Sequence, residues 1–114
     1  MIRYLQLIEA MDLAGVAAML HPELEIIEHP NKLNPAGGRS DIAAVRAAGE
    51  RGKAIMAAQR YAIRHLLVDG DRAAVAMTWT GTLKDGRTMT AEICSIIEVR
   101  DGKIRRQEQF DCFT

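Results

Sequence analysis

Few side chains in this sequence could transfer a proton or polarise a carbonyl group. Glu92 and Asp111 are carboxylic acids in the last third of the chain. Two carboxylates that lie close together in a sheltered place repel each other as anions, which raises one pKa and makes a general acid or base near neutral pH. Tyr61 could donate its hydroxyl to a carbonyl oxygen, and His29 could act as a general base. We therefore take Asp111, Glu92, His29 and Tyr61 as the candidate catalytic residues.

Each candidate also has a purely structural interpretation. The two acids could form a solvated pair at a rim or be neutralised by arginine, because perturbed carboxylates also occur in structural networks. His29 could cap a strand end, and Tyr61 could be a core residue whose hydroxyl reaches the surface. The choice depends on how the strands that carry these residues pair.

Three Asp-Gly dipeptides divide the second half of the chain, at residues 69–70, 85–86 and 101–102. Asp and Gly tolerate the positive φ that tight hairpin turns require, so this spacing predicts an antiparallel meander. Its four strands are expected over residues 60–68, 72–83, 87–100 and 103–113.

The expected loop lengths set the register of the hairpins. A two-residue loop at 85–86 would place Trp79 opposite Glu92, and a two-residue loop at 101–102 would place Glu92 opposite Asp111. A three-residue loop at 69–71 would place Tyr61 opposite Trp79. This register predicts two neighbouring carboxylates beside the tryptophan.

One face of the predicted sheet then mixes polar and apolar side chains. Its rows are Tyr61, Trp79, Glu92 and Asp111; Ile63, Met77, Cys94 and Gln109; and His65, Val75, Ile96 and Gln107. Buried polar groups without partners cost about 1–3 kcal/mol each, so a partly solvated cavity accommodates this face better than a solid core does. The expected ligand-binding residues are Trp79, Met77, Cys94, Ile96, Gln107, Gln109, Ile63 and His65.

The opposite face of the predicted sheet is apolar enough to be buried. It would carry Thr78, Thr80, Ala91, Ile93, Ser95, Ile97 and Phe110. A second subunit is the expected cover, so we expect a homodimer. In this register Cys94 and Cys112 point to opposite faces, which argues against a disulfide between them.

The first half of the chain predicts helices and a short strand. Apolar residues recur at helical spacing over residues 3–20, and residues 23–29 form a strand-like run that ends at Pro30. Residues 31–39 are rich in Asn, Pro and Gly and predict a loop. Ser40 is a plausible N-cap of a second helix that continues to just before residue 60. Helices followed by strands indicate an α+β domain whose helices cover one face of the sheet.

Composition limits the classes of partner. The 114 residues suit one domain, and they include 15 Lys or Arg and 15 Asp or Glu, a formal net charge of zero. Such a balance does not favour nucleic acid or a membrane surface. Two cysteines without metal-ligand spacing predict no metal, and the N-terminal residues have no signal-peptide pattern, so we expect a cytoplasmic protein.

The order of these elements resembles the SnoaL-like polyketide cyclase branch of the nuclear transport factor 2-like (cystatin-like) superfamily. The resemblance spans nearly the whole chain and is carried by the segments at 68–72 (VDGDR), 79–82 (WTGT) and 99–104 (VRDGKI). It implies a cone-shaped fold, in which a curved, mainly antiparallel sheet wraps N-terminal helices around an apolar pocket, and a dimer through the outer sheet face. The charged pairs of the epoxide hydrolases in this superfamily would fall at Gln107 and Gln109 and at Met77 and Trp79, so that mechanism is not expected here.

The sequence supports a cofactor-independent cyclase or isomerase that acts on a small apolar carbonyl compound, with Asp111 or Glu92 moving the proton. The alternative is a non-catalytic ligand-binding or dimeric scaffold protein of the same fold. A third possibility, the small subunit of a ring-hydroxylating dioxygenase, shares the fold and implies a large partner chain.

Overall fold

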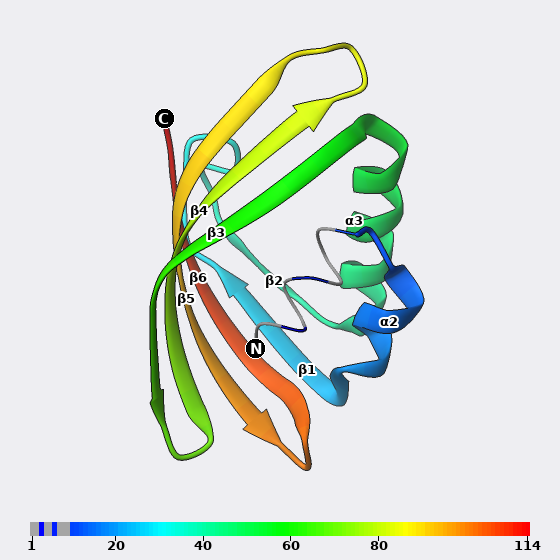
Figure 1. Cartoon of the computed structure of the whole chain (residues 1–114). Coiled ribbons are helices and arrows are strands. Elements are labelled where there is room, and N and C mark those ends of the chain that lie inside the picture. Colours follow the sequence, from blue (N-terminus) through cyan, green and yellow to red (C-terminus); the bar gives the residue numbers. More distant parts are fainter. Residues whose placement is uncertain (1–2, 4–5, 7–9) are drawn as a thin grey trace.

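The structure is a computed structural model that describes residue 3, residue 6 and residues 10–114. A six-stranded curved sheet has the strand order β2-β1-β6-β5-β4-β3, and the helices α2 and α3 lie on its concave side (Figure 1). The elements are α2 Leu13–Ala18, β1 Leu20–Glu28, β2 Gly38–Ser40, α3 Ile42–Ile55, β3 Met56–Asp69, β4 Arg72–Leu83, β5 Thr88–Arg100 and β6 Lys103–Phe113.

This architecture confirms the predicted α+β class and the cone-shaped arrangement of helices on a mainly antiparallel sheet. The strands β3 to β6 form the expected meander, whereas β1 runs parallel to β6 and antiparallel to β2. The parallel pairing between β1 and β6 brings the first strand of the chain beside the last. Among the described residues, no helix combines the length and the apolar character needed to cross a membrane.

The helix starts differ in detail from the prediction. The Asp41 side chain, not that of Ser40, caps α3 by accepting a hydrogen bond from the Ala44 amide at 2.9 Å, while Ser40 ends β2. The predicted helix over 3–20 is interrupted, because Met11 adopts a φ of +54° before the short helix α2. Arg3 and Gln6 are helical; residues 1–2, 4–5 and 7–9 lie outside the described residues.

The change from α3 to β3 comes earlier than its alanine-rich sequence suggests. Strand β3 begins at Met56, which pairs with Leu83, and the Ile55 carbonyl accepts a hydrogen bond from the Lys84 amide at 2.9 Å. Sheet pairing with β4 therefore overrides the helix propensity of Ala57 and Ala58.

The first hairpin has a shorter loop than predicted and a compensating bulge. Asp69 pairs with Arg72, so the loop has two residues rather than three, and Arg64 is the extra residue of a bulge further along β3. Beyond the bulge, Tyr61 pairs with Trp79 as predicted. Ile63 likewise pairs with Met77, whereas His65 pairs with Ala76 instead of Val75.

The other two hairpins decide which side chains of β5 face the helices. The second hairpin has a three-residue loop rather than a two-residue one, since Leu83 donates to the Arg87 carbonyl at 2.8 Å. The third turn has two residues as predicted, with positive φ at both Asp101 and Gly102, but Arg105 is an extra residue in β6. Each difference moves the pairing by one residue, which exchanges the two faces.

The concave face therefore carries residues that were expected on the outer face. Ala91, Ile93, Ser95 and Ile97 are all buried, so their predicted outward placement was wrong. Ala91, Ile93 and Ile97 form a core with buried residues of the neighbouring strands, namely Leu20, Leu24, Val75, Met77 and Ile104.

Candidate functional site

A line of polar side chains runs along the concave side of β6. Gln107 Nε2 donates hydrogen bonds to Ser95 Oγ at 3.4 Å and to Gln109 Oε1 at 3.0 Å. Gln109 Nε2 in turn donates to Oδ1 and Oδ2 of Asp111, at 3.0 and 3.1 Å. The oxygen of the Gln109 amide accepts from Gln107, so its nitrogen is left to donate to Asp111. The line of hydrogen bonds therefore orients the Asp111 carboxylate.

The Asp111 carboxyl has an unusual electrostatic environment. Partial burial raises its pKa above the ordinary value of 3.8, the hydrogen bond from Gln109 lowers it, and the nearby Glu28 carboxylate raises it further. Burial has the largest effect, so the net direction is upward. A carboxyl group with a raised pKa can hold and release a proton closer to neutral pH.

Glu28 is the second acid on this face, and sequence reasoning missed it. It lies at the end of β1, where it pairs with Gln109 across the parallel ladder. The Asn31 side-chain amide donates to Glu28 Oε2 at 2.6 Å, which holds the carboxylate at the start of the loop that follows β1. No local pattern marks Glu28, because its position depends on a parallel pairing between the two ends of the chain.

Apolar residues surround Asp111 on the sheet. Its cross-strand neighbour is Ile93, which pairs with Met77, which in turn pairs with Ile63. The next row along the sheet contains Tyr61, Trp79, Ala91 and Phe113 in pairing order. The predicted rows of Tyr61 with Trp79 and of Ile63 with Met77 are thus present, and Gln107, Gln109 and Asp111 lie on the expected face.

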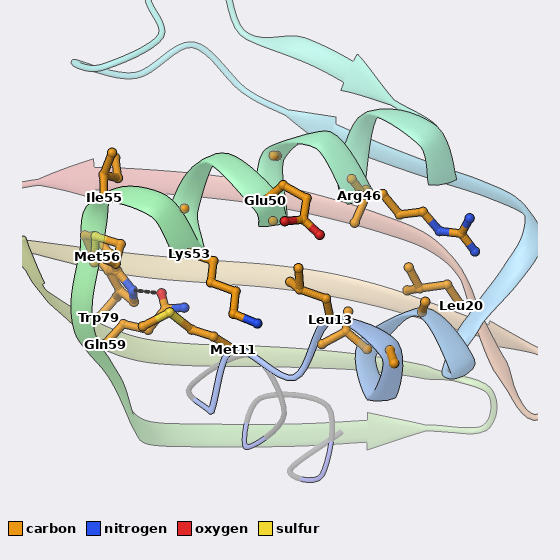
Figure 2. A pocket seen from close by; sticks show the side chains of 17 residues that line it. Met11, Leu13, Leu20, Arg46, Glu50, Lys53, Ile55, Met56, Gln59 and Trp79 are labelled. Atoms are coloured by element: carbon orange, nitrogen blue, oxygen red, sulfur yellow. Dashed lines mark hydrogen bonds between the residues drawn. The ribbon is translucent and has the colours of Figure 1, made fainter.

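A cavity of about 620 Å³ lies between the helices and this end of the sheet (Figure 2). Its walls are mostly apolar side chains of α2, α3 and the adjoining strands, including Leu13, Val16, Leu20, Val45, Ile55 and Met56. Trp79 lines it from the sheet, and the indole Nε1 donates to Gln59 Oε1 at 3.0 Å. Neither Asp111 nor Glu28 is among the lining residues, so the cavity and the carboxylates are neighbouring features of one concave face.

Gly81 allows the tryptophan to lie where it does. A Cβ atom at this position would come within 2.6 Å of the Trp79 ring and of the Met56 methyl group. The missing side chain therefore leaves space for two residues that line the cavity. Phe113 packs against the Trp79 indole in an edge-to-face contact, with ring centroids 6.3 Å apart.

Glu92 does not lie beside Asp111. It pairs with Thr78 and with Cys112 on the outer face. There its carboxylate accepts hydrogen bonds from the Thr78 hydroxyl and forms an ion pair with Arg64, whose Nη2 atom lies 2.6 Å from Glu92 Oε2. Its predicted place beside the Asp111 carboxyl was wrong, because the one-residue shifts in the two hairpins turn it outward. Glu92 instead fits the structural interpretation in which an arginine neutralises the acid.

Cys94, Ile96 and His65 also point away from the cavity, contrary to prediction. Cys94 pairs with Ala76 and Ile96 with Ala74, and all three predicted residues are exposed. Cys94 and Cys112 are free thiols on the same outer face, so their expected placement on opposite faces was wrong as well. The same one-residue shifts account for these corrections, and the bulge at Arg64 accounts for His65.

His29 lies on the outer side of the sheet rather than at the mouth of the cavity. Its Nε2 atom lies 2.7 Å from Glu108 Oε1, and its ring stacks on Phe110 with centroids 4.3 Å apart. These contacts favour the structural interpretation of His29. Tyr61, by contrast, is half-buried on the concave face and packs against the core.

The described residues offer no ready metal site, since none of their His, Cys, Asp and Glu side chains gather in groups of three or more that could hold an ion. The polar groups in and near the cavity are carboxylates, side-chain amides and the cationic groups of lysine and arginine. This set is suited to proton transfer and to hydrogen bonding of a small molecule.

Comparison with known proteins agrees with this geometry. A family model described as the SnoaL-like domain matches residues 1–107. The chain belongs to the SnoaL-like domain family. A search of curated proteins found no match for this SnoaL-like domain.

Solved structures share its fold. One is a nuclear transport factor 2-like protein of unknown function from Burkholderia pseudomallei, with 24% identity, a TM-score of 0.78, and coverage of 95% of this chain and 84% of that one. Another is IdmH of Streptomyces antibioticus, a candidate polyketide cyclase, with 17% identity, a TM-score of 0.77, and coverage of 96% and 87%. A third is an epoxide hydrolase of Mycobacterium tuberculosis, with 18% identity, a TM-score of 0.76, and coverage of 98% and 77%. At these identities the likeness concerns the fold alone.

Proposed function

We propose that this SnoaL-like domain binds a small, mainly apolar carbonyl compound on its concave face and catalyses a proton transfer on it through Asp111. The observation that carries the proposal is the Asp111 carboxyl: it is half-buried among apolar residues, has a raised pKa, and is oriented by Gln109. It lies one row from Trp79, which lines the cavity.

The chemistry follows from the groups present. As a carboxylate, Asp111 takes a proton from the carbon next to a carbonyl group, and the electron pair of the C–H bond moves onto the carbonyl oxygen as an enolate. The same carboxyl then returns the proton at another carbon, so no external oxidant or reductant is needed. The nearby Glu28 carboxylate favours the protonated form of Asp111, which supports the acid half of this cycle.

The proposal is tested by exchange of the α-protons of 2-tetralone in D₂O, followed by proton NMR. Wild-type protein should accelerate the exchange, and Asp111→Asn should reduce the acceleration by at least about 100-fold, the usual contribution of a positioned acid or base. Glu92→Gln is the matched control on the outer face and should retain it. Equal exchange by wild type and Asp111→Asn would refute the role of Asp111.

A non-catalytic binding function is the second candidate, and one observation favours it: the cavity lining includes Trp79 and Gln59 but neither Asp111 nor Glu28. Quenching of Trp79 by a bound molecule, without any exchange, would support binding alone. Gly52→Leu separates a cavity ligand from a surface ligand, because Gly52 lines the cavity and a Cβ there meets nothing within 4 Å. The added side chain should occupy part of the cavity and weaken the quenching.

We also infer that a second copy of the chain covers the outer face of the sheet. Ile96 and Phe110 are 41% and 42% exposed on this face, and Leu67 at its edge is 70% exposed. Exposed apolar groups that gather on one sheet face are typical of an interface between subunits. The ion pair of Arg64 with Glu92 and the hydrogen bond between His29 and Glu108 would lie around this apolar centre.

A further inference from the structure

The cavity between the helices and the sheet has an uneven distribution of charge. Its polar lining residues are Arg46, Glu50, Lys53 and Gln59, and the first three come from the single helix α3. Gln59 accepts the hydrogen bond from the Trp79 indole. The rest of the described lining is apolar or glycine, so α3 supplies all the formal charge, two cations against one carboxylate.

Lys53 is the cation best placed to meet a bound molecule. Figure 2 shows its side chain leaving α3 and crossing the hollow toward Met11 and Leu13, between the tryptophan end and the α2 end of the cavity. Lys53 is an exposed residue of this mostly apolar lining, and a lysine in such a place can lay its four-carbon stem on the apolar surface while its ammonium group stays in water. A cation over low-dielectric walls attracts an anion more strongly than one in open water does.

The other two charged residues, Arg46 and Glu50, set the net charge of the lining together with Lys53. Arg46 lies seven residues before Lys53, which on a helix places it about two turns away on the same side. Glu50 lies between them, three residues before Lys53 and four after Arg46. One carboxylate between two cations leaves a net charge of one positive unit, so a ligand with one negative charge neutralises the lining.

We infer that the cavity takes a monoanionic amphipathic ligand, such as a carboxylic acid with an apolar ring body, and that Lys53 selects it. This inference rests on the proposed function and names the substrate class. The apolar body lies between α2 and Trp79, and the anionic group lies at Lys53. The reacting carbonyl group would be on the part of the ligand that faces the Asp111 side of the sheet.

A matched pair of fluorescent probes tests this directly. 8-Anilino-1-naphthalenesulfonate is a monoanion with two aromatic groups, and N-phenyl-1-naphthylamine is its neutral counterpart without the sulfonate. Binding is followed by quenching of Trp79, the only tryptophan of the chain. The Gly52→Leu variant identifies the part of the signal that comes from the cavity, as opposed to the outer face.

The expected result is a selective loss. Lys53→Met, which keeps the length and apolar character of the stem, should weaken cavity binding of the anionic probe by about five- to tenfold, as expected for loss of one partly solvated ionic contact. It should change binding of the neutral probe by less than about twofold. Lys53→Arg should retain binding of the anion, and Lys103→Met, which replaces an exposed lysine at the start of β6, should change the binding of neither probe.

The failure of this inference differs from the failure of the proposed function. If the neutral probe binds in the cavity but Lys53→Met weakens both probes equally or neither, the ligand is not selected by its charge, and the inference is overturned. If neither probe quenches Trp79 in a way that Gly52→Leu weakens, the cavity binds no such ligand, and the proposed function fails with it. Thermal unfolding of Lys53→Met and Lys53→Arg confirms that both variants fold.

Discussion

The Gln109 side-chain amide donates to both carboxylate oxygens of Asp111, at 3.0 and 3.1 Å. These hydrogen bonds favour the ionised form and oppose the effects of burial and of Glu28 on the pKa. Gln107, which donates to Gln109 Oε1, keeps the amide turned so that its nitrogen faces the acid. The site therefore balances one group that stabilises the anion against two effects that destabilise it.

Removing this donor should raise the pKa of Asp111 further. In Gln109→Leu the carboxyl group keeps its burial and its acidic neighbour but loses its hydrogen-bond donor, so its titration should move to higher pH. Carbon-13 NMR of labelled aspartate measures this titration directly. Thr78→Val, which removes a hydroxyl donor from the outer-face carboxylate of Glu92, should leave the Asp111 titration unchanged. A shift to lower pH in Gln109→Leu would contradict the assignment.

Asp111→Asn should change how stability depends on pH. Because the folded-state pKa of Asp111 is raised, the folded protein binds this proton more readily than the unfolded chain does, and stability is lost as pH rises from the ordinary value of 3.8 through the folded-state pKa. Asparagine does not titrate, so the variant should gain stability relative to wild type as pH increases across that interval. Urea unfolding at a series of pH values between 4 and 7 tests this, and a relative gain toward acid pH would refute it.

Gly52→Ala should stabilise the protein. Helical glycine costs about 0.5–1 kcal/mol relative to alanine, and a Cβ at Gly52 meets nothing within 4 Å, so the variant should gain close to that amount. Gly49→Ala is the matched comparison in the same helix. Its Cβ would come within 2.8 Å of Leu13 Cδ2, so its gain should be smaller. Urea unfolding of the two variants compares them, and a larger gain at Gly49 would show that the contact between α2 and α3 is looser than described.

Gly81→Ala should destabilise the sheet and disturb the cavity together. The added methyl group meets the Trp79 ring and the Met56 methyl group at 2.6 Å, and overpacking of this kind costs about 1–3 kcal/mol. A change in Trp79 emission should accompany the lower midpoint of unfolding. Thr80→Ala, a neighbouring substitution on the outer face, should change stability by less than about 0.5 kcal/mol.

Phe110→Asp should reduce self-association if a second copy covers the outer face. A charge at this position removes the apolar group on which His29 stacks and places a carboxylate near that of Glu108. Sedimentation velocity should show a dimer for wild type and a monomer for the variant. Val68→Asp is the control, because Val68 is 69% exposed but points to the opposite side of the sheet. A monomeric wild type would contradict the inferred interface.

The sequence by itself determined the class of fold and most of the strands. The Asp-Gly turns placed 72–83 and 103–113 as strands with the ends observed, since positive φ at Gly70, Gly86 and Gly102 is a local requirement that local residues reveal. The same local signals put Asp111, Gln109 and Trp79 on the face toward the helices.

Only the tertiary structure decided which acid accompanies Asp111. Side chains alternate along a strand, so the extra residue Arg105 in β6 and the longer second loop were enough to turn Glu92 outward and bring Ile93 inward. Glu28 came to the site through the parallel pairing of β1 with β6, which joins segments about eighty residues apart. Such pairing is set by the packing of the whole sheet, and no short stretch of sequence contains it.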